Sequence, residues 1–266
     1  MGRHRDHLVE GSDPQLSVAL HPPASDAGLR PVLLLHGFAS STKLNWTDTG
    51  WIRFLNEAGR AVLTVDLPGH GASAAPEARD SYSPSRIRAD VLQVLQDHHV
   101  VPLREGVPAS GVDIIGYSLG SRLAWEFGAT QPELVHRMVL GGPGSGDPLA
   151  EFDLAAAQEL LAEGTPIQDA RTAELMRMAR LVPTNDVFAL LTMVEAVKDE
   201  PFIPSEAVPR MPLLLVAGEN DDLAATAQEL ADLAPQAELL KLPARTHANA
   251  VTSRAFKSAA VAFLSA

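Results

Sequence analysis

Apolar residues along the 266-residue chain fall into short runs that alternate with amphipathic helical patterns. Continuous apolar runs bounded by turn residues are typical of strands that are buried on both faces of a sheet. Strands are expected at residues 16–20, 31–35, 61–65, 112–115, 135–140, 212–217 and 238–242. Helical patterns separate most of these runs. This alternation predicts a mostly parallel, doubly wound α/β sheet with helices on both faces.

The rhythm changes between Pro148 and Pro209, where no strand pattern is present. Three amphipathic helical patterns take its place, at residues 152–163, 169–181 and 186–199. Helices inserted into an otherwise alternating chain suggest a small cap over one end of the sheet. We therefore expect a core made of two parts, interrupted by a helical cap, with the division 1–147, 148–208 and 209–266.

The same pattern also predicts two irregular segments and one continuous last helix. Residues 1–15 are polar, and no ordered element is expected at the outset. A loop containing Trp46 and Trp51 is expected before a helix that ends at Gly59. A single last helix is expected over residues 248–264.

Composition narrows the classes of function. With 46% hydrophobic and 20% charged residues, the chain is ordinarily globular, and its formal net charge of −12 argues against nucleic-acid and anionic-membrane partners. The absence of cysteine excludes disulfides, thiol nucleophiles and cysteine metal sites. No Walker motif, Rossmann fingerprint or metal-binding helix pair is present, so neither a cofactor nor a metal is expected. The charged start lacks the apolar core of a signal peptide, and no apolar run reaches the roughly 18 residues of a membrane span. A cytoplasmic location is therefore expected. The sequence leaves the oligomeric state open.

A Gly-x-Ser-x-Gly pentapeptide at residues 116–120 lies between a strand pattern and a helical pattern. Three fixed residues recur by chance, and an ordinary Gly-rich turn is the alternative interpretation. In this context, however, the motif is typical of a nucleophile elbow, a strained turn that exposes the serine hydroxyl above the sheet. The helix N-terminus behind the turn favours developing negative charge. Ser118 is therefore the candidate nucleophile.

Other chemically capable residues also follow predicted strands, namely the segment His36–Phe38, Asp221 and His247. Loops that leave the carboxyl ends of parallel strands converge on one edge of the sheet. A serine hydroxyl needs a nearby base, a histidine can accept its proton near neutral pH, and a carboxylate can orient that histidine. The order Ser, Asp, His is the one found in α/β-hydrolases.

The chain resembles the α/β-hydrolase fold superfamily, in its lidded, lipase/esterase-like branch, over nearly its whole length. The likeness rests on five segments in family order: His36–Phe38, Asp66–Ser73, Gly116–Gly120, Gly218–Asp221 and His247. The resemblance implies that Ser118 is the nucleophile, His247 the general base and Asp221 its orienting acid. It also implies an oxyanion hole made by the backbone N–H groups of Phe38 and Leu119, and a helical cap inserted after the sixth strand.

Two other aspartates compete for the role of the acid. Asp222 could orient the histidine while Asp221 caps the next helix, but the family spacing Gly-x-x-Asp favours Asp221. Asp147 occupies the acid position of some relatives, although we favour a turn residue before Pro148. In this family, histidines placed like His36 and His70 mostly brace the active-site loops, and both are interpreted as structural.

The leading hypothesis is a serine hydrolase that cleaves a small-to-medium, apolar carboxylic ester through an acyl-enzyme. A C–C bond hydrolase acting on a diketone and a thioesterase use the same triad and remain alternatives. A non-catalytic binding module on the same fold is a further alternative, since fold does not guarantee activity. Epoxide hydrolases and haloalkane dehalogenases are disfavoured, because those relatives carry Asp where this chain has Ser118. A small-molecule, ester-like substrate is the expected partner.

Overall fold

The computed structural model describes residues 7, 8, 15–23, 25 and 27–266. In this part of the chain, eight strands form one sheet in the order β1-β2-β4-β3-β5-β6-β7-β8. The pairs β1–β2 and β2–β4 are antiparallel, and every other pair is parallel. The strands are β1 (His7–Leu8), β2 (Ser17–His21), β3 (Val32–Leu35), β4 (Val62–Val65), β5 (Val112–Tyr117), β6 (Val135–Gly141), β7 (Leu213–Gly218) and β8 (Ala237–Leu242). The predicted mostly parallel α/β fold is confirmed.

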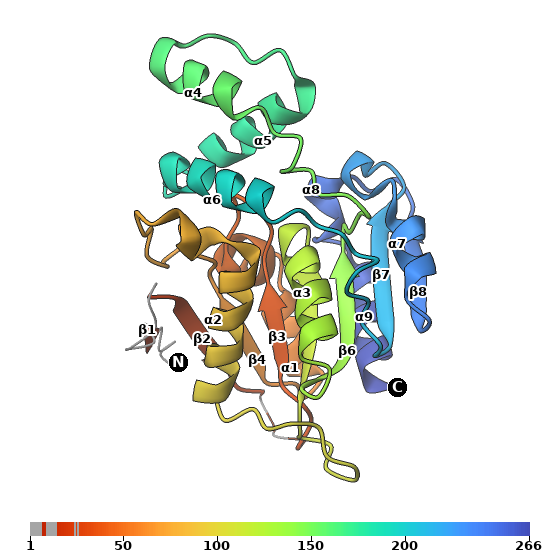
Figure 1. The fold of residues 1–266 in the computed structure, drawn as a ribbon. Coiled ribbons are helices and arrows are strands. Elements are labelled where there is room, and N and C mark those ends of the chain that lie inside the picture. The colour runs from red at the N-terminus through yellow and green to blue at the C-terminus, as the bar shows by residue number, and fades with distance from the viewer. Residues whose placement is uncertain (1–6, 9–14, 24, 26) are drawn as a thin grey trace.

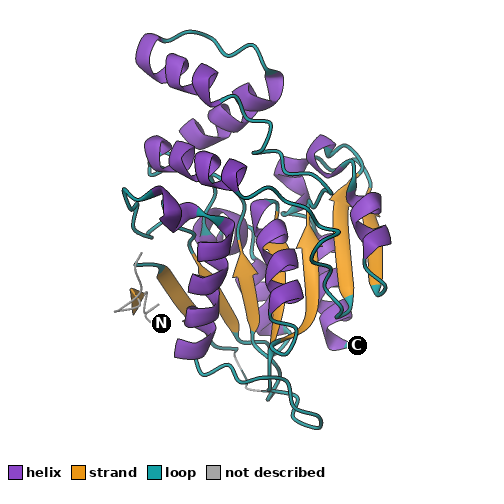
Figure 2. Ribbon diagram, viewed as in Figure 1, coloured by secondary structure: helices purple, strands orange, loops and turns teal. Residues whose placement is uncertain are grey.

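Helices cover both faces of this sheet (Figures 1 and 2). One face packs against α2 (Pro84–Asp97), α3 (Leu119–Thr130) and α7 (Ala227–Leu233), and the other against α1 (Trp51–Glu57) and α9 (Arg254–Ser265). Successive residues of a strand point to opposite faces. In β3, Leu33 and Leu35 accordingly join the first apolar cluster, whereas Val32 and Leu34 join the second. Burial on both faces explains why the central strands are continuous apolar runs.

Three helices between β6 and β7 lie beyond the carboxyl ends of the strands (Figure 1). They are α4 (Leu154–Glu163), α5 (Ala170–Leu181) and α6 (Val187–Asp199), close to the expected positions. Each is capped by an aspartate side chain that accepts a hydrogen bond from the first turn: Asp153, Asp169 and Asp186. We call residues 148–208 the helical insertion. Its function as a cap, and the division of the chain at these bounds, remain predictions.

The last helix differs from the expected single element. It is two helices, α8 (His247–Ala250) and α9, separated at residues 251–253. Ser253 caps α9 by accepting a hydrogen bond from the Phe256 N–H at 3.4 Å. Trp51 Nε1 donates to the Val251 carbonyl in the break at 2.8 Å. The apolar periodicity continues through the break, and it therefore concealed the separate short helix that begins at His247.

Two further expectations are corrected. The expected loop around Trp46 contains a short π-helix, η1 (Lys43–Thr47), and Trp51 is the first residue of α1 rather than a loop residue. His7–Leu8 forms the short strand β1 against β2, although no element was expected there, while the expectation for residues 1–6 and 9–14 lies outside the described residues. Short 3₁₀-helices are η2 (Arg79–Tyr82) and η3 (Asp222–Ala224). Among the described helices, none has the length and apolar character needed to cross a membrane.

Candidate active site

Ser118 occupies the sharp turn between β5 and α3 with φ 55° and ψ −117°, in the region that non-glycine residues rarely adopt. The neighbouring glycines make this turn possible. A Cβ at Gly116 would overlap the Gly120 carbonyl, and a Cβ at Gly120 would overlap the carbonyl of Leu35 in β3. Backbone segments from β3, β5 and α3 therefore pack directly on one another around the serine.

The loop after β3 passes beside this turn. A Cβ at Gly37 would lie 3.2 Å from Ser118 Cβ, so the backbone and the serine are in direct contact. Asn45 accepts the Gly37 N–H at 2.9 Å. The next amide, that of Phe38, and the amide of Leu119 donate no hydrogen bond to any described residue. Two unused N–H donors thus flank Ser118, one from each segment.

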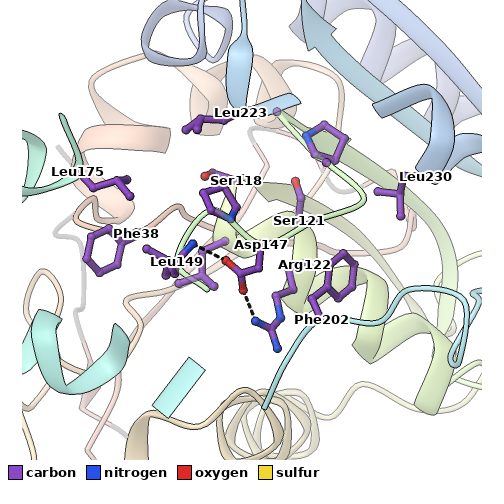
Figure 3. A pocket seen from close by; sticks show the side chains of 16 residues that line it. Phe38, Ser118, Ser121, Arg122, Asp147, Leu149, Leu175, Phe202, Leu223 and Leu230 are labelled. Atoms are coloured by element: carbon purple, nitrogen blue, oxygen red, sulfur yellow. Dashed lines mark hydrogen bonds and ion pairs between the residues drawn. The ribbon is translucent and has the colours of Figure 1, made fainter. Parts of the chain in front are cut away.

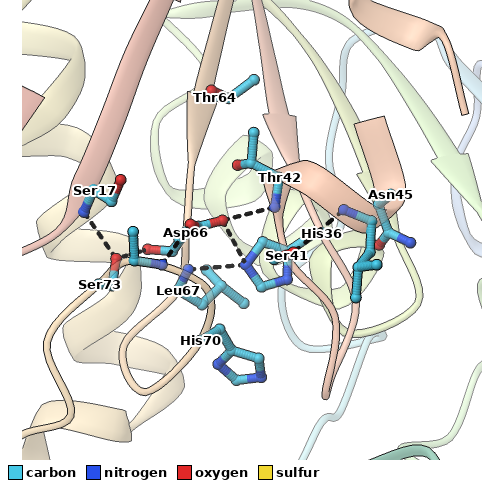
Figure 4. Close-up of polar contacts among 12 residues, drawn as sticks. Ser17, His36, Ser41, Thr42, Asn45, Thr64, Asp66, Leu67, His70 and Ser73 are labelled. Atoms are coloured by element: carbon cyan, nitrogen blue, oxygen red, sulfur yellow. Dashed lines mark hydrogen bonds and ion pairs between the residues drawn. The ribbon is translucent and has the colours of Figure 1, made fainter. Parts of the chain in front are cut away.

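Buried histidines and one aspartate hold the same loop in place (Figure 4). His36 Nε2 accepts the Leu67 N–H at 3.0 Å, and Asp66 Oδ1 accepts the Thr42 N–H at 2.6 Å. His70 Nε2 accepts the Ala39 N–H at 3.1 Å, next to Phe38. Burial lowers the pKa of His70 to about 3, and burial also lowers the pKa of His36. Both rings are therefore neutral acceptors, in agreement with the expected bracing function.

Asp221 and His247 come together as expected. His247 Nδ1 donates to the Asp221 carboxylate, at 2.9 Å from Oδ2 and 3.0 Å from Oδ1. Asp221 is 4% exposed, and its Oδ1 also accepts the N–H groups of Leu223 and Ala224. The same carboxylate thus contacts the histidine and caps η3. Asp222 is exposed, and no hydrogen bond joins it to His247.

The structure does not join the two halves of the expected triad directly. No hydrogen bond links the Ser118 hydroxyl to the His247 ring. The ring lies against Gly142 at the end of β6, where an added Cβ would be 2.8 Å from His247 Cε1. Asp147, the other candidate acid, pairs with the buried guanidinium of Arg122 and not with the histidine.

A small inner cavity of about 40 Å³ opens at Ser118 (Figure 3). Apart from the paired Arg122 and Asp147, most of the side chains that line it are apolar. In Figure 3, Phe38 and Leu175 lie toward one end of the cavity, and Phe202 and Leu230 toward the other. Its walls also include Leu119, Ser121, Gly142, Pro143, Gly144, Gly146, Pro148, Leu149 and Leu223.

A larger outer cavity of about 720 Å³ is lined by His247 and not by Ser118. It shares the side chains of Leu175 and Leu223 with the inner cavity, so these two leucines form the partition between the cavities. Four exposed carboxylates and one guanidinium belong to its wall: Glu151, Asp169, Glu174, Asp222 and Arg171.

In the described part of the chain, no group of three or more metal-binding side chains is arranged to hold an ion.

Three contacts of the site were not found from the sequence. Tyr117 donates its hydroxyl to the His247 carbonyl at 2.5 Å, and the two rings lie 5.4 Å apart. Asn45 holds the loop through Gly37, and Gly142 gives His247 its space. Of these residues, only Gly142 could have been noticed in the sequence, because the Gly141-Gly142 pair follows the apolar run of a predicted strand.

Comparisons with known proteins agree with this fold. A model of the alpha/beta hydrolase family matches residues 32–259. The chain belongs to the alpha/beta hydrolase family. The expectation of an enzyme with an α/β-hydrolase fold is thereby confirmed.

Individual members of the alpha/beta hydrolase family match parts of the chain. A 2-hydroxy-6-oxononadienedioate/2-hydroxy-6-oxononatrienedioate hydrolase of Cupriavidus pinatubonensis is 30% identical over 53% of this chain and 45% of its own length. Epoxide hydrolase A of Mycobacterium tuberculosis is 30% identical over 47% of this chain and 34% of its own length. The chain thus spans less than half the length of these curated relatives. The enol-lactonase of Burkholderia xenovorans has the same fold, with a TM-score of 0.74 over 96% of this chain and 98% of its own, at 18% identity.

Proposed function

We propose that this chain is a serine hydrolase that cleaves a small-to-medium apolar carboxylic ester. The observation that carries the proposal is the position of Ser118. It sits in a strained turn at the start of α3, between two N–H groups that bond to no described residue. A serine held in this way can attack a carbonyl while the two donors stabilise the negative charge that develops on the carbonyl oxygen.

In the proposed reaction, His247 removes the proton from Ser118 as the hydroxyl attacks the carbonyl carbon. The Phe38 and Leu119 amides hold the oxyanion, and His247 then gives its proton to the leaving alcohol. Water, activated by the same histidine, releases the acid from Ser118. Asp221 orients the ring through Nδ1 and stabilises its positive charge. The bond between Ser118 and His247 forms in the reacting complex, as catalytic hydrogen bonds often do.

A C–C bond hydrolase is the second candidate, and one observation favours it. The Cupriavidus relative, 30% identical over 53% of this chain, carries the name of a hydrolase that acts on an oxo-dienedioate. Thioesters would react through the same residues. A panel that contains an ester, a thioester and a vinylogous diketone separates the three, because only the preferred class shows the largest kcat/KM. The epoxide hydrolase name of another relative fits less well, since Ser118 stands at the position where such enzymes carry Asp.

The direct test is the substitution Ser118→Ala, assayed with p-nitrophenyl acetate. Loss of the nucleophile is expected to reduce kcat/KM by at least roughly a thousandfold, because members of a triad act as a unit. Ser145→Ala is the matched control, since Ser145 lies in the loop after β6, at the same edge of the sheet, but lines neither cavity. Equal, retained activity of the two variants would overturn the proposal. Absence of hydrolysis by the folded, unsubstituted protein would favour a binding module on this fold.

A further inference from the structure

The two cavities divide the space around Ser118 by chemistry as well as by size. Ser118, Phe38 and Leu119 line the inner cavity, whereas His247 lines the outer one. In the proposed reaction, the oxygen that leaves must take its proton from His247. The leaving alcohol therefore has to lie on the His247 side of the partition, and the acyl chain is directed to the other side.

The size of the inner cavity then limits the acyl group. The inner cavity, at about 40 Å³, is far smaller than the outer cavity, at about 720 Å³. The inner cavity therefore favours a short acyl group. Three side chains of its wall are tightly packed, because Phe38, Leu149 and Leu230 are between 1% and 6% exposed. A longer chain has to displace packed side chains.

The charge of the outer cavity limits the alcohol. Its wall carries four carboxylates and a single guanidinium. Two of the carboxylates have basic partners, since Glu151 pairs with Arg171 and Glu174 pairs with Arg177. Asp169 caps α5, and Asp222 has no ion pair with any described residue. The cavity therefore repels an anionic alcohol and accepts a neutral or cationic one.

Resting on the proposed function, we infer that the substrate combines a short acyl group in the inner cavity with a larger, neutral or cationic alcohol in the outer cavity. The acyl specificity is set by the side chains around Leu149 and Leu230. The selectivity against negative charge is set by the outer wall, above all by Asp222. This assignment disfavours dicarboxylate substrates of the kind named for the Cupriavidus relative.

The acyl side is tested with p-nitrophenyl acetate, butanoate, hexanoate and octanoate. We expect kcat/KM to fall at least about tenfold between butanoate and octanoate, because overpacking a small, tightly packed cavity is costly. Leu149→Ala and Leu230→Ala, each enlarging the cavity, are expected to move the optimum to longer chains. Met178→Ala is the matched control, because Met178 lines only the outer cavity. An unchanged optimum in both leucine variants, or a shift in the control, overturns the assignment.

The alcohol side is tested with 4-acetoxybenzoate and its methyl ester, which differ in one negative charge. We expect the neutral ester to have the higher kcat/KM, by a ratio that shrinks as salt is added. Asp222→Asn is expected to reduce this ratio about two- to fivefold at low salt, since one exposed charge is removed. Glu133→Gln, a carboxylate that lines neither cavity, is the control. A preference for the anionic ester overturns the inference.

Failure of the inference and failure of the proposed function give different results. If Ser118→Ala keeps the p-nitrophenyl acetate activity, the proposed function fails, and the inference fails with it. If activity depends on Ser118 but chain length and charge have no effect, only the inference is wrong. The same panel thus separates the reaction from its specificity.

Discussion

Two regions meet at the candidate site, and they are held by different means. At the edge of the sheet, backbone contacts position Ser118: glycines at 116 and 120 allow β3, β5 and α3 to touch, and backbone N–H groups are accepted by His36, His70 and Asp66. In the helical insertion, side chains provide the contacts. Such packing tolerates substitution far better than backbone overlap.

The two connections of the insertion have one common anchor. Arg122, one turn after Ser118 on α3, pairs with Asp147 in the first connection and donates to the Glu200 carbonyl in the second. The ring of Phe202 lies 5.5 Å from its guanidinium.

The sheet edge is therefore fixed by backbone contacts at many points. The insertion is joined to the core by side chains, of which Arg122 contacts both ends, while Ser85 donates to the Glu200 carboxylate and Asn185 donates to the Ala39 carbonyl. The proposed reaction residue Ser118 belongs to the sheet edge, whereas the proposed selectivity involves both regions, through Leu149 of the insertion and Leu230 of α7.

The largest expected effect comes from a Cβ at the elbow. Gly120→Ala places that atom on the Leu35 carbonyl, and we expect the loss of more than about 4 kcal/mol of unfolding free energy. Gly164→Ala in the insertion is the matched change. Gly164 has φ +77° but nothing within 4 Å of the added atom, so only about 1–2 kcal/mol is expected. Urea unfolding of both variants measures the two losses of unfolding free energy. Losses of similar size would contradict the difference between the regions.

The second test concerns the acid of the site. Asp221→Asn is expected to lower kcat by about 10⁴-fold, because the ring loses its orienting charge while the amide oxygen can still cap η3. Asp222→Asn, the adjacent change, is expected to lower kcat for a neutral ester far less. Steady-state kinetics with circular dichroism as a folding check provide the comparison. The reverse order of the two losses would transfer the role to Asp222.

Arg122→Met tests the common anchor of the insertion. Arg122 and Asp147 side chains are 6% and 5% exposed, so removing the guanidinium leaves a buried carboxylate unpaired, at a cost of about 3–5 kcal/mol. The control Arg171→Met breaks an exposed pair with Glu151, where the loss is expected to stay below about 1 kcal/mol. Hydrogen exchange should also rise in α4 to α6 for the first variant. Unchanged exchange there would mean that Arg122 does not hold the insertion.

The smallest expected effect is a dependence of the unfolding free energy on pH that arises from His70 at the sheet edge. The pKa of His70 is about 3 in the folded protein and roughly 6.5 in the unfolded chain, so its neutral form stabilises the fold above pH 6.5. That contribution is lost as the pH falls toward 3, by up to about 1.4 kcal/mol per pH unit. For His70→Gln, we expect the free energy of unfolding, measured with urea, to change less steeply with pH between about pH 7 and pH 5. Identical slopes would show that His70 is not the group that titrates.

The difference between the regions also explains what could be predicted from the sequence. Elements at the sheet edge follow from local patterns: apolar runs give the strands, and residues just after them, such as Ser118, Asp221 and His247, converge because the strands are parallel. The helices of the insertion were also predictable, since each has apolar spacing and an aspartate cap.

Features that depend on contacts between distant segments were not predictable. The break before α9 depends on a local cap at Ser253 and a hydrogen bond from Trp51, about which the apolar periodicity carries no information. The contact between Tyr117 and His247 joins residues 130 positions apart. The partition between the cavities arises because Leu175 of the insertion packs near Leu223 of the core. Such contacts are properties of the folded chain.

Ser118 is the proposed nucleophile at this edge of the sheet. Treatment of the folded protein with a fluorophosphonate, followed by intact-mass and peptide mass spectrometry, tests this proposal most directly. We expect one adduct per chain, located on Ser118, which disappears in Ser118→Ala and forms much more slowly in Asp221→Asn. Absence of an adduct in the folded protein, or an adduct on another serine, would show that Ser118 is not the nucleophile.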